Sequence, residues 1–190
     1  MTPLQNEVIL EVEGVSKLFS RSVTTTRQRM SKVFWKTLIH RSVEEVTELE
    51  NGEFWSIDNV SFTLRRGESL GIIGFNGAGK TTLLRILAGQ MLPDRGEVRV
   101  WGKSVSMIDL TAGFSSSASG RKNIYLRGAM LGRSRAQIDE NLDEIIEFAE
   151  LGDAIDAPIN TYSSGMRMRL AFSIMIKTNP DILFLSLIHI

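Results

Sequence analysis

The stretch Gly74–Thr82 reads GFNGAGKTT and follows the pattern G-x-x-x-x-G-K-[ST]. It stands between an apolar run that ends at Phe75 and the sequence TTLLRILAG, whose spacing predicts a helix closed near Gly89. Glycines let the backbone curl so that successive N–H groups point inward and form a nest for an anion. The positive end of the helix macrodipole strengthens that attraction. The alternative is a glycine-rich turn that happens to contain a lysine.

Each position of this loop has an expected part in holding a nucleoside triphosphate. Lys80 is expected to bring a point charge to the β- and γ-phosphates. Thr81 is placed so that its hydroxyl can ligate Mg²⁺. The expected nucleotide-binding residues of the loop are Gly74, Phe75, Asn76, Gly77, Ala78, Gly79, Lys80, Thr81 and Thr82.

Composition limits the remaining possibilities. The chain has 190 residues, which is enough for one well-packed domain. Lys and Arg number 22 and Asp and Glu number 22, so the formal net charge is zero and nucleic acid is not an expected partner. Cysteine is absent, which excludes disulfides and thiolate chemistry. No run approaches the roughly 18 apolar residues of a membrane span, so we expect a cytoplasmic chain that meets a membrane only through a partner.

The pattern along the chain predicts an α/β fold. Strands are expected over residues 7–15 and 96–102. Between them, one strand is expected to start at Asn59 and to end at a turn at Arg66-Gly67, and a second, buried strand is expected to follow that turn and to end at Phe75. Another buried strand is expected in PDILFL, residues 180–185.

Residues 120–179 are expected to be mostly helical. Ser134 and Gln137 match a capping box, and Gly152 is the expected stop of the helix that follows. A last helix is expected from near Ser163 to just before Asn179-Pro180. The expected core positions between these signals follow helical spacing and are Ile138, Leu142, Ile145, Ile146 and Ala149.

Residues 21–53 differ in character from the rest of the chain, because a basic half precedes an acidic half. In RMSKVFWKTLIH, helical spacing puts Arg29, Lys32, Lys36 and His40 on one face and Met30, Val33, Phe34 and Leu38 on another. Two interpretations stay open. One is a surface helix with a solvated basic face, and the other is a basic amphipathic helix at a membrane surface or a membrane partner.

A second motif, YSSGMRMRLAFS at Tyr162–Ser173, resembles the signature sequence LSGGQ of ABC transporter ATPases. Ser163 takes the serine position, Ser164 and Gly165 take the two glycine positions, and Met166 takes the glutamine position. By itself this turn is also compatible with a plain helix N-cap. In the family, the motif reaches the γ-phosphate of the nucleotide held by the other subunit. The resemblance therefore implies ATP bound between two head-to-tail copies, with Ser163, Ser164 and Gly165 acting in trans.

The resemblance covers nearly all of residues 7–184 and implies an α/β fold. That fold is a P-loop NTPase core of the ABC ATPase type, with a small antiparallel β subdomain and an α-helical subdomain, incomplete at the C-terminus. The lead-in FWSIDNVSF and the motif YSSGM look like ATPases of polysaccharide, O-antigen or teichoic-acid exporters. The implied cofactors are ATP and Mg²⁺, with Lys80 as the catalytic residue. The implied partners are a second copy and a membrane permease, at the cytoplasmic face of the bacterial inner membrane.

Family members usually stack an aromatic residue on the adenine base. Phe19, in VSKLF, matches that position best, and Trp55 is the alternative. A flat apolar ring binds a purine without base-specific contacts. A plain core role for Phe19 is the competing interpretation.

The chain departs from the family pattern in two places. The segment at Gly113-Phe114 takes the place of a glutamine that senses the permease. After the apolar strand, the positions of the Mg²⁺-holding Asp and the water-polarising Glu fall at Ser186 and Leu187, and His189 stands too early to be the family's switch histidine.

The missing acids suggest that the last six residues are not native. The sequence LSLIHI, residues 185–190, can be encoded by CTG TCT CTT ATA CAC ATC, the transposase end used for sequencing libraries. We expect residues 1–184 to be an ABC ATPase domain and residues 185–190 to be non-native.

The expected function is the ATP-binding and ATP-hydrolysing subunit of a bacterial polysaccharide exporter, although the chain as written lacks the acids needed for hydrolysis. Two alternatives stay open. One is a non-hydrolytic ATP-binding regulatory module, and the other is a soluble ABC ATPase that acts on nucleic acid or ribosomes.

Overall fold

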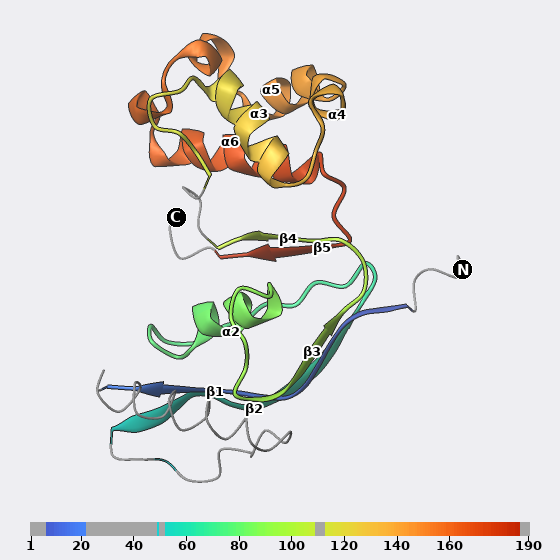
Figure 1. The fold of residues 1–190 in the computed structure, drawn as a ribbon, viewed down its shortest axis with the longest axis vertical. Coiled ribbons are helices and arrows are strands. Elements are labelled where there is room, and N and C mark those ends of the chain that lie inside the picture. The colour runs from blue at the N-terminus through green and yellow to red at the C-terminus, as the bar shows by residue number, and fades with distance from the viewer. Residues whose placement is uncertain (1–6, 22–48, 50–51, 109–112, 187–190) are drawn as a thin grey trace, which may run out of the picture. The chain divides into compact units, whose positions relative to one another are not determined.

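The computed structural model describes residues 7–21, 49, 52–108 and 113–186. These residues belong to two compact units, Met1–Trp101 and Gly102–Ile190 (Figure 1). The predicted basic helix around residues 29–40 and the last residues, 187–190, lie outside the described ranges.

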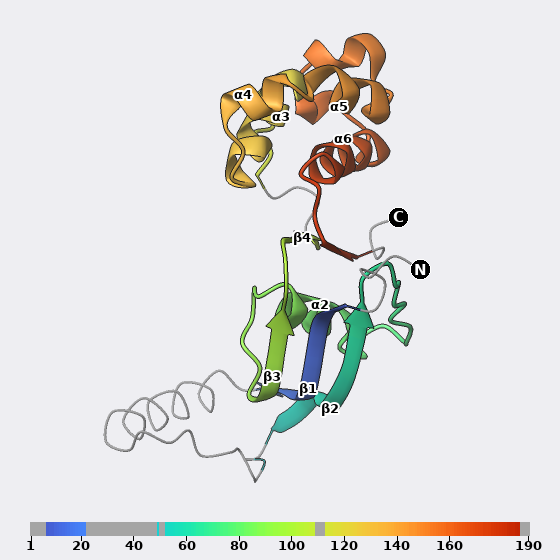
Figure 2. The same cartoon turned by 90° about the vertical axis from the view of Figure 1, so that its right-hand side faces the viewer.

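The first unit contains a three-stranded antiparallel sheet. Its strands are β1 (Val8–Ser20), β2 (Glu53–Arg65) and β3 (Arg95–Val100), in the order β2-β1-β3 (Figure 2). All three strands were predicted, but β1 extends beyond residue 15 and β2 begins before Asn59. Their length comes from mutual pairing, because Leu18 and Ser20 of β1 still find ladder partners in Trp55 and Glu53.

The helix α2 (Lys80–Leu87) lies over one face of this sheet (Figure 1). Its Leu83, Ile86 and Leu87 are buried, as the helical spacing predicts. Gly89, with a φ of 69°, ends the helix in a left-handed turn in which Gly89 N–H donates to Ile86 O and Gln90 N–H donates to Arg85 O. This is the glycine-closed C-terminus that the sequence predicts.

The predicted buried strand ending at Phe75 is wrong. Residues 68–75 have no strand structure, and the side chains of Ile73 and Phe75 are 96% and 91% exposed. A strand forms only when its N–H and C=O groups pair with a neighbour, and no described strand pairs with this segment. The apolar residues therefore favour strand structure locally, but they do not determine which strand would pair with this segment.

The second unit contains a short parallel pair, β4 (Ser104–Met107) and β5 (Ile182–Leu185). The strand β5 was predicted from PDILFL, with Ile182 and Phe184 buried. The strand β4 was not predicted, because SVSM offers only two apolar side chains to a pattern search. Leu185 pairs with Met107 in this ladder, so it has the environment of a strand residue.

Helices make up most of the second unit, as predicted. They are α3 (Gly120–Met130), α4 (Arg135–Asp139), α5 (Leu142–Ala149), α6 (Ser164–Ile176) and the 3₁₀ turns η2 (Gly152–Asp156) and η3 (Ile159–Thr161). They enclose a core in which Ile138, Ile145 and Ala149 are buried and Leu142 and Ile146 are partly buried. The predicted core positions are therefore confirmed.

The helix ends of this unit follow the predicted capping with one exception. Gln137 N–H donates to Ser134 Oγ at 3.3 Å, and Ser134 N–H donates to Gln137 Oε1 at 3.0 Å, which confirms the capping box. Gly152 is not the helix stop. The helix α5 ends at Ala149 with Glu150 in the left-handed region at a φ of 51°, and Gly152 instead opens η2.

Truncation of the core residue Leu170 tests how firmly this second unit is packed. Leu170 is fully buried on α6, so Leu170→Ala is expected to lower the free energy of unfolding by about 2–5 kcal/mol. Leu126→Ala is the matched control, because Leu126 is 45% exposed on α3 and its loss is expected to change stability by no more than about 0.5 kcal/mol. Urea unfolding monitored by circular dichroism measures both, and equal losses would contradict the packing described.

Candidate nucleotide-binding site

The loop Gly74–Gly79 curls around the ammonium group of Lys80. Gly77 and Gly79 have φ values of 84° and 86°, which residues with a Cβ rarely adopt. Lys80 Nζ donates to the carbonyl oxygens of Gly74 and Phe75, each at 2.7 Å. An ammonium has three donors, so the third remains for a ligand on the open side of the loop.

At the N-terminus of α2, neither a side-chain cap nor an acid neutralises the positive partial charge of the helix start. Its N-cap is Gly79, which offers no side-chain acceptor, and the first turn contains no acid. The first N–H groups of a helix have no intrahelical acceptor, and no described group accepts from those of Lys80, Thr81 or Thr82. By contrast, serine side chains cap α3, α4 and α6, and two acids stand in the first turn of α5. The geometry therefore suits an anion at α2.

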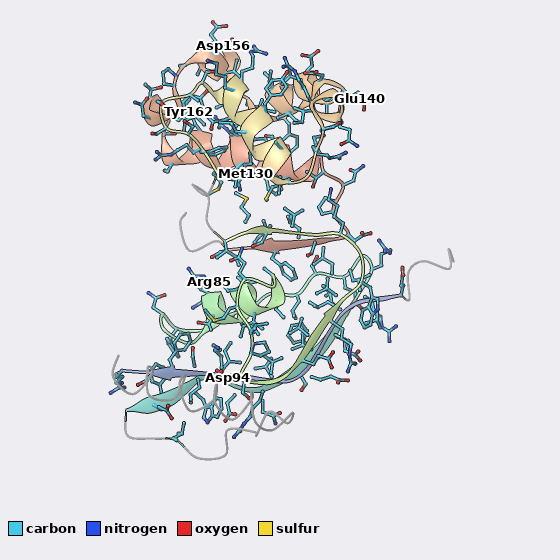
Figure 3. All side chains as sticks on the ribbon, viewed as in Figure 1. Arg85, Asp94, Met130, Glu140, Asp156 and Tyr162 are labelled. Atoms are coloured by element: carbon cyan, nitrogen blue, oxygen red, sulfur yellow. The ribbon has the colours of Figure 1, made fainter. Side chains whose placement is uncertain are left out.

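The loop is fixed against the edge strand β2. A Cβ added at Gly79 would lie 2.3 Å from the carbonyl oxygen of Ser56, so the two backbones touch at this point. After α2, the chain is fixed again at Asp94, labelled in Figure 3, whose carboxylate accepts from Leu18 N–H at 2.7 Å and pairs with Lys17 at 3.2 Å. Both ends of α2 are thus tied to the same part of the sheet.

Phe19, the expected base-stacking residue, lies near this anchor on β1. Its side chain is 36% exposed, so the competing idea that it is simply part of the core is wrong. The alternative, Trp55, has the guanidinium of Arg95 at 4.5 Å from its ring centroid, so one ring face is already covered. The geometry favours Phe19 over Trp55.

The serine turn at Ser163–Gly165 lies in the second unit, at the N-terminus of α6. Ser163 Oγ accepts from Met166 N–H at 3.2 Å, so Ser163 is the N-cap, and Ser163, Ser164 and Gly165 are all exposed. Tyr162, labelled in Figure 3, is buried just before the turn and donates its hydroxyl hydrogen to the carbonyl of Ala154. Burial raises the pKa of the Tyr162 phenol. The buried Tyr162 side chain therefore fixes the chain just before the exposed turn Ser163–Gly165.

The cap at Ser163 can be tested by its effect on stability. Ser163→Ala is expected to lower the free energy of unfolding by about 1 kcal/mol, because it leaves the Met166 N–H without its acceptor. Ser163→Asn keeps a cap and is expected to stay close to the original stability. Thermal unfolding followed by calorimetry measures both variants. Equal losses in the two would mean that the hydroxyl does not act as a cap.

The described residues offer fewer ligands for a metal ion than the family pattern has. Thr81 is half-buried in the first turn of α2 and can offer one hydroxyl. Within the described residues, no group of three or more His, Asp or Glu side chains could hold a metal ion. Ser186 is described and carries no charge, whereas Leu187 and His189 lie outside the described ranges. One hydroxyl does not make a Mg²⁺ site, so the ion would depend on oxygens of a bound phosphate.

The place of the expected glutamine is occupied by an apolar group. Phe114 is half-buried and lies under the guanidinium of Arg127, 5.0 Å from the ring centroid. Gly113 has a φ of 83°, and a Cβ there would meet the Met130 sulfur at 2.6 Å. This segment is therefore a packed connection and presents no amide side chain.

A large cavity of about 930 Å³ lies elsewhere, in the second unit. Its walls come from β4, β5, α5 and α6, including Met107, Phe148, Phe172 and Leu185, and the Glu144–Lys177 ion pair stands at it. The sequence did not predict this cavity, because its walls come from four separate segments. Its walls are mostly apolar, whereas the N–H groups that a phosphate needs are open at the start of α2, so we place the candidate site at α2. Among the described helices, none is long and apolar enough to cross a membrane.

The chain is similar to export and transport proteins of several bacteria, among them the following three. The chain is 39% identical over 180 residues to ABC transporter protein AbcA of Aeromonas salmonicida, covering 95% of this chain and 54% of that protein. It is 48% identical over 133 residues to the teichoic acids export ATP-binding protein TagH of Lactococcus lactis subsp. lactis, covering 70% and 28%. It is 41% identical over 150 residues to the O-antigen export system ATP-binding protein RfbB of Klebsiella pneumoniae, covering 79% and 61%. The chain thus spans from 28% to 61% of these relatives.

Solved structures give the same fold. A dimeric ATP-binding cassette in a post-hydrolysis state, bound to ADP and Pi, superposes with a TM-score of 0.66 at 17% identity, covering 92% of this chain and 72% of that one. The predicted fold class, a P-loop NTPase core of the ABC ATPase type with an antiparallel β subdomain and a helical subdomain, is confirmed. The family model for ABC transporters matches residues 57–185, which is more than half of the sequence, and the chain therefore belongs to the ABC transporter family.

Proposed function

We propose that this chain binds ATP through the loop Gly74–Gly79 and the N-terminus of α2. The observation that carries this proposal is the uncapped, acid-free N-terminus of α2, with Lys80 held beside it by two loop carbonyls. Backbone N–H groups and an adjacent ammonium group together form the usual surroundings of a polyphosphate. Mg²⁺ would arrive with the nucleotide, with Thr81 and phosphate oxygens among its ligands, and Phe19 would lie against the base.

We further propose that the protein is the ATP-binding subunit of a bacterial exporter of polysaccharide or lipid-linked glycan. The support comes from the relatives, which are named for teichoic acid and O-antigen export. Lys80 would then be the catalytic residue, acting by charge on the phosphoryl group that is transferred. The protein would sit at the cytoplasmic face of the membrane through a permease subunit, without nucleic acid as a partner.

A second copy of the chain would complete the site. In the exposed turn Ser163–Gly165, the Ser163 side chain caps only the Met166 N–H, so the other N–H groups at the start of α6 suit the γ-phosphate of a nucleotide held by the other copy. The two copies would then pair head to tail around two ATP molecules. A dimer that forms only with ATP, measured by light scattering, is the expected behaviour of such an arrangement.

Nucleotide titration tests the phosphate site directly. Isothermal titration should show binding of MgATP at least about ten times tighter than binding of AMP, because the β- and γ-phosphates supply the charge-assisted hydrogen bonds. Equal affinities for ATP and AMP would contradict the proposal.

Co-expression with a permease subunit of a glycan exporter, followed by purification from detergent-solubilised membranes, tests the partner. Recovery with nucleic acid or ribosomes instead would favour a soluble ABC ATPase.

One observation favours a non-hydrolytic module as the second candidate. Ser186 stands where the family has the Mg²⁺-holding acid, and the described residues contain no metal-binding cluster of acids. This candidate predicts that the chain binds ATP without releasing ADP. A coupled assay of ADP release under saturating ATP separates binding with turnover from binding alone.

A further inference from the structure

Two phenylalanine rings lie side by side at the end of the antiparallel ladder. Phe19 of β1 and Phe54 of β2 are direct cross-strand partners, with ring centroids 6.4 Å apart and ring planes inclined by 31°. Both remain open to solvent, with 36% of Phe19 and 42% of Phe54 exposed. Cross-strand partners point to the same face of a sheet. The rings therefore form one accessible aromatic surface.

Arg21 holds the second ring of this pair in place. Its guanidinium carbon lies 5.7 Å from the centroid of Phe54, within the range of a cation–π interaction. Its backbone N–H donates to the Gly52 carbonyl at 2.9 Å, which extends the pairing of the two strands past Phe19 and Phe54. The Phe54 ring is thus contacted by Phe19 and by Arg21, and a surface that is already ordered loses little entropy when it binds a ligand.

The distance from this aromatic pair to the phosphate loop fits one nucleotide. Gly79 touches the backbone of Ser56, which stands two residues after Phe54 in β2. The ladder is irregular at Ser56, so the contact lies at most about 7 Å along the strand from Phe54. In a nucleotide, the ribose separates the base from the phosphates, and this spacing would allow the base to lie at the ring pair while the phosphates lie at the loop.

The neighbouring aromatic residue does not share this surface. Trp55 follows Phe54 directly, and successive strand residues point to opposite faces of the sheet. Its ring is paired with Arg95 of β3. The ring that can act together with Phe19 is therefore Phe54, which the sequence pattern did not single out.

We propose that Phe54, held by Arg21, is the second aromatic contact of the base in the nucleotide site. The base would lie on Phe19 and meet the Phe54 ring at its side, so that recognition uses the faces of the rings and not the hydrogen-bonding edge of the base. This inference rests on the proposed ATP-binding function. It adds a residue whose loss weakens the hold on the base and leaves the hold on the phosphates intact.

Two probes separate the base from the phosphates. Isothermal titration of the full chain with ATP and with inorganic tripolyphosphate gives an affinity for each. Phe54→Ala is expected to weaken ATP binding by about 5- to 150-fold, the range for loss of one aromatic stacking partner, and to leave the tripolyphosphate affinity within about twofold. Phe54→Leu keeps an apolar side chain without a ring and is expected to show the same selective loss.

The matched control is Phe148→Ala. Phe148 is 50% exposed and pairs with Phe172 at 6.1 Å, so it repeats the geometry of the Phe54 pair, but it stands in the second unit. It is expected to leave both affinities unchanged. An unchanged ATP affinity in both Phe54 variants overturns the inference, and so does an equal loss for ATP and tripolyphosphate. An original chain that binds neither probe is a different result, because it overturns the proposed ATP-binding function itself.

Discussion

Replacing Lys80 by alanine is expected to weaken ATP binding by about 10- to 100-fold, since a hydrogen bond from a charged group contributes about 1.5–3 kcal/mol. The Lys80 ammonium already bridges the carbonyls of Gly74 and Phe75, so it stands over the loop without needing to be ordered by the ligand. The same loss is expected for tripolyphosphate, because the proposed partner of Lys80 is phosphate and not the base. Isothermal titration with both probes measures the effect.

The fold should tolerate this change. The residues Gly74 and Phe75 are exposed, so water can replace the lost donor, and the free energy of unfolding is expected to change by less than about 1 kcal/mol. Lys122→Ala is the matched control, because Lys122 is an exposed lysine on α3 in the second unit. If Lys80→Ala binds ATP within twofold of the original chain, the loop does not hold phosphates in the proposed way.

Replacing Gly79 by alanine is expected to destabilise the first unit strongly and to remove ATP binding. Two effects combine at this position. Left-handed backbone costs a residue with a Cβ about 1–2 kcal/mol, and forcing atoms into an occupied space costs about 1–3 kcal/mol more. The Gly79 Cβ would lie 2.3 Å from a backbone oxygen of Ser56, which cannot swing away as a flexible side chain would. We expect a loss of about 2–5 kcal/mol in the free energy of unfolding, together with loss of ATP binding.

Gly77→Ala isolates the backbone effect. Gly77 has nearly the same φ, 84°, but a Cβ added there would meet nothing within 4 Å. Its cost is expected to be only the left-handed strain of about 1–2 kcal/mol. Urea unfolding of both variants compares the two costs. If Gly77→Ala and Gly79→Ala prove equally destabilising, the close contact between Gly79 and Ser56 does not anchor the loop.

The sequence by itself determined the features that depend on near neighbours in the chain. The glycine pattern before Lys80, the helix start near Ser163 and the capping box at Ser134 are all correct in the structure. Each relies on backbone preference or on hydrogen bonds between residues three or four positions apart, so a short window contains all the participants. The helical core of the second unit was predictable for the same reason, because its buried side chains repeat at helical spacing.

Only the tertiary structure decided the features that need a partner far along the chain. The apolar residues up to Phe75 did not form the predicted strand, and SVSM, which is half serine, did form one, because ladder pairing depends on which segment lies alongside. The contact of Gly79 with Ser56 and the pairing of Phe19 with Phe54 join residues that are distant in sequence. The sequence pattern could identify a phosphate loop and one candidate ring. The neighbours of each depend on strand register, which is fixed when the strands pair.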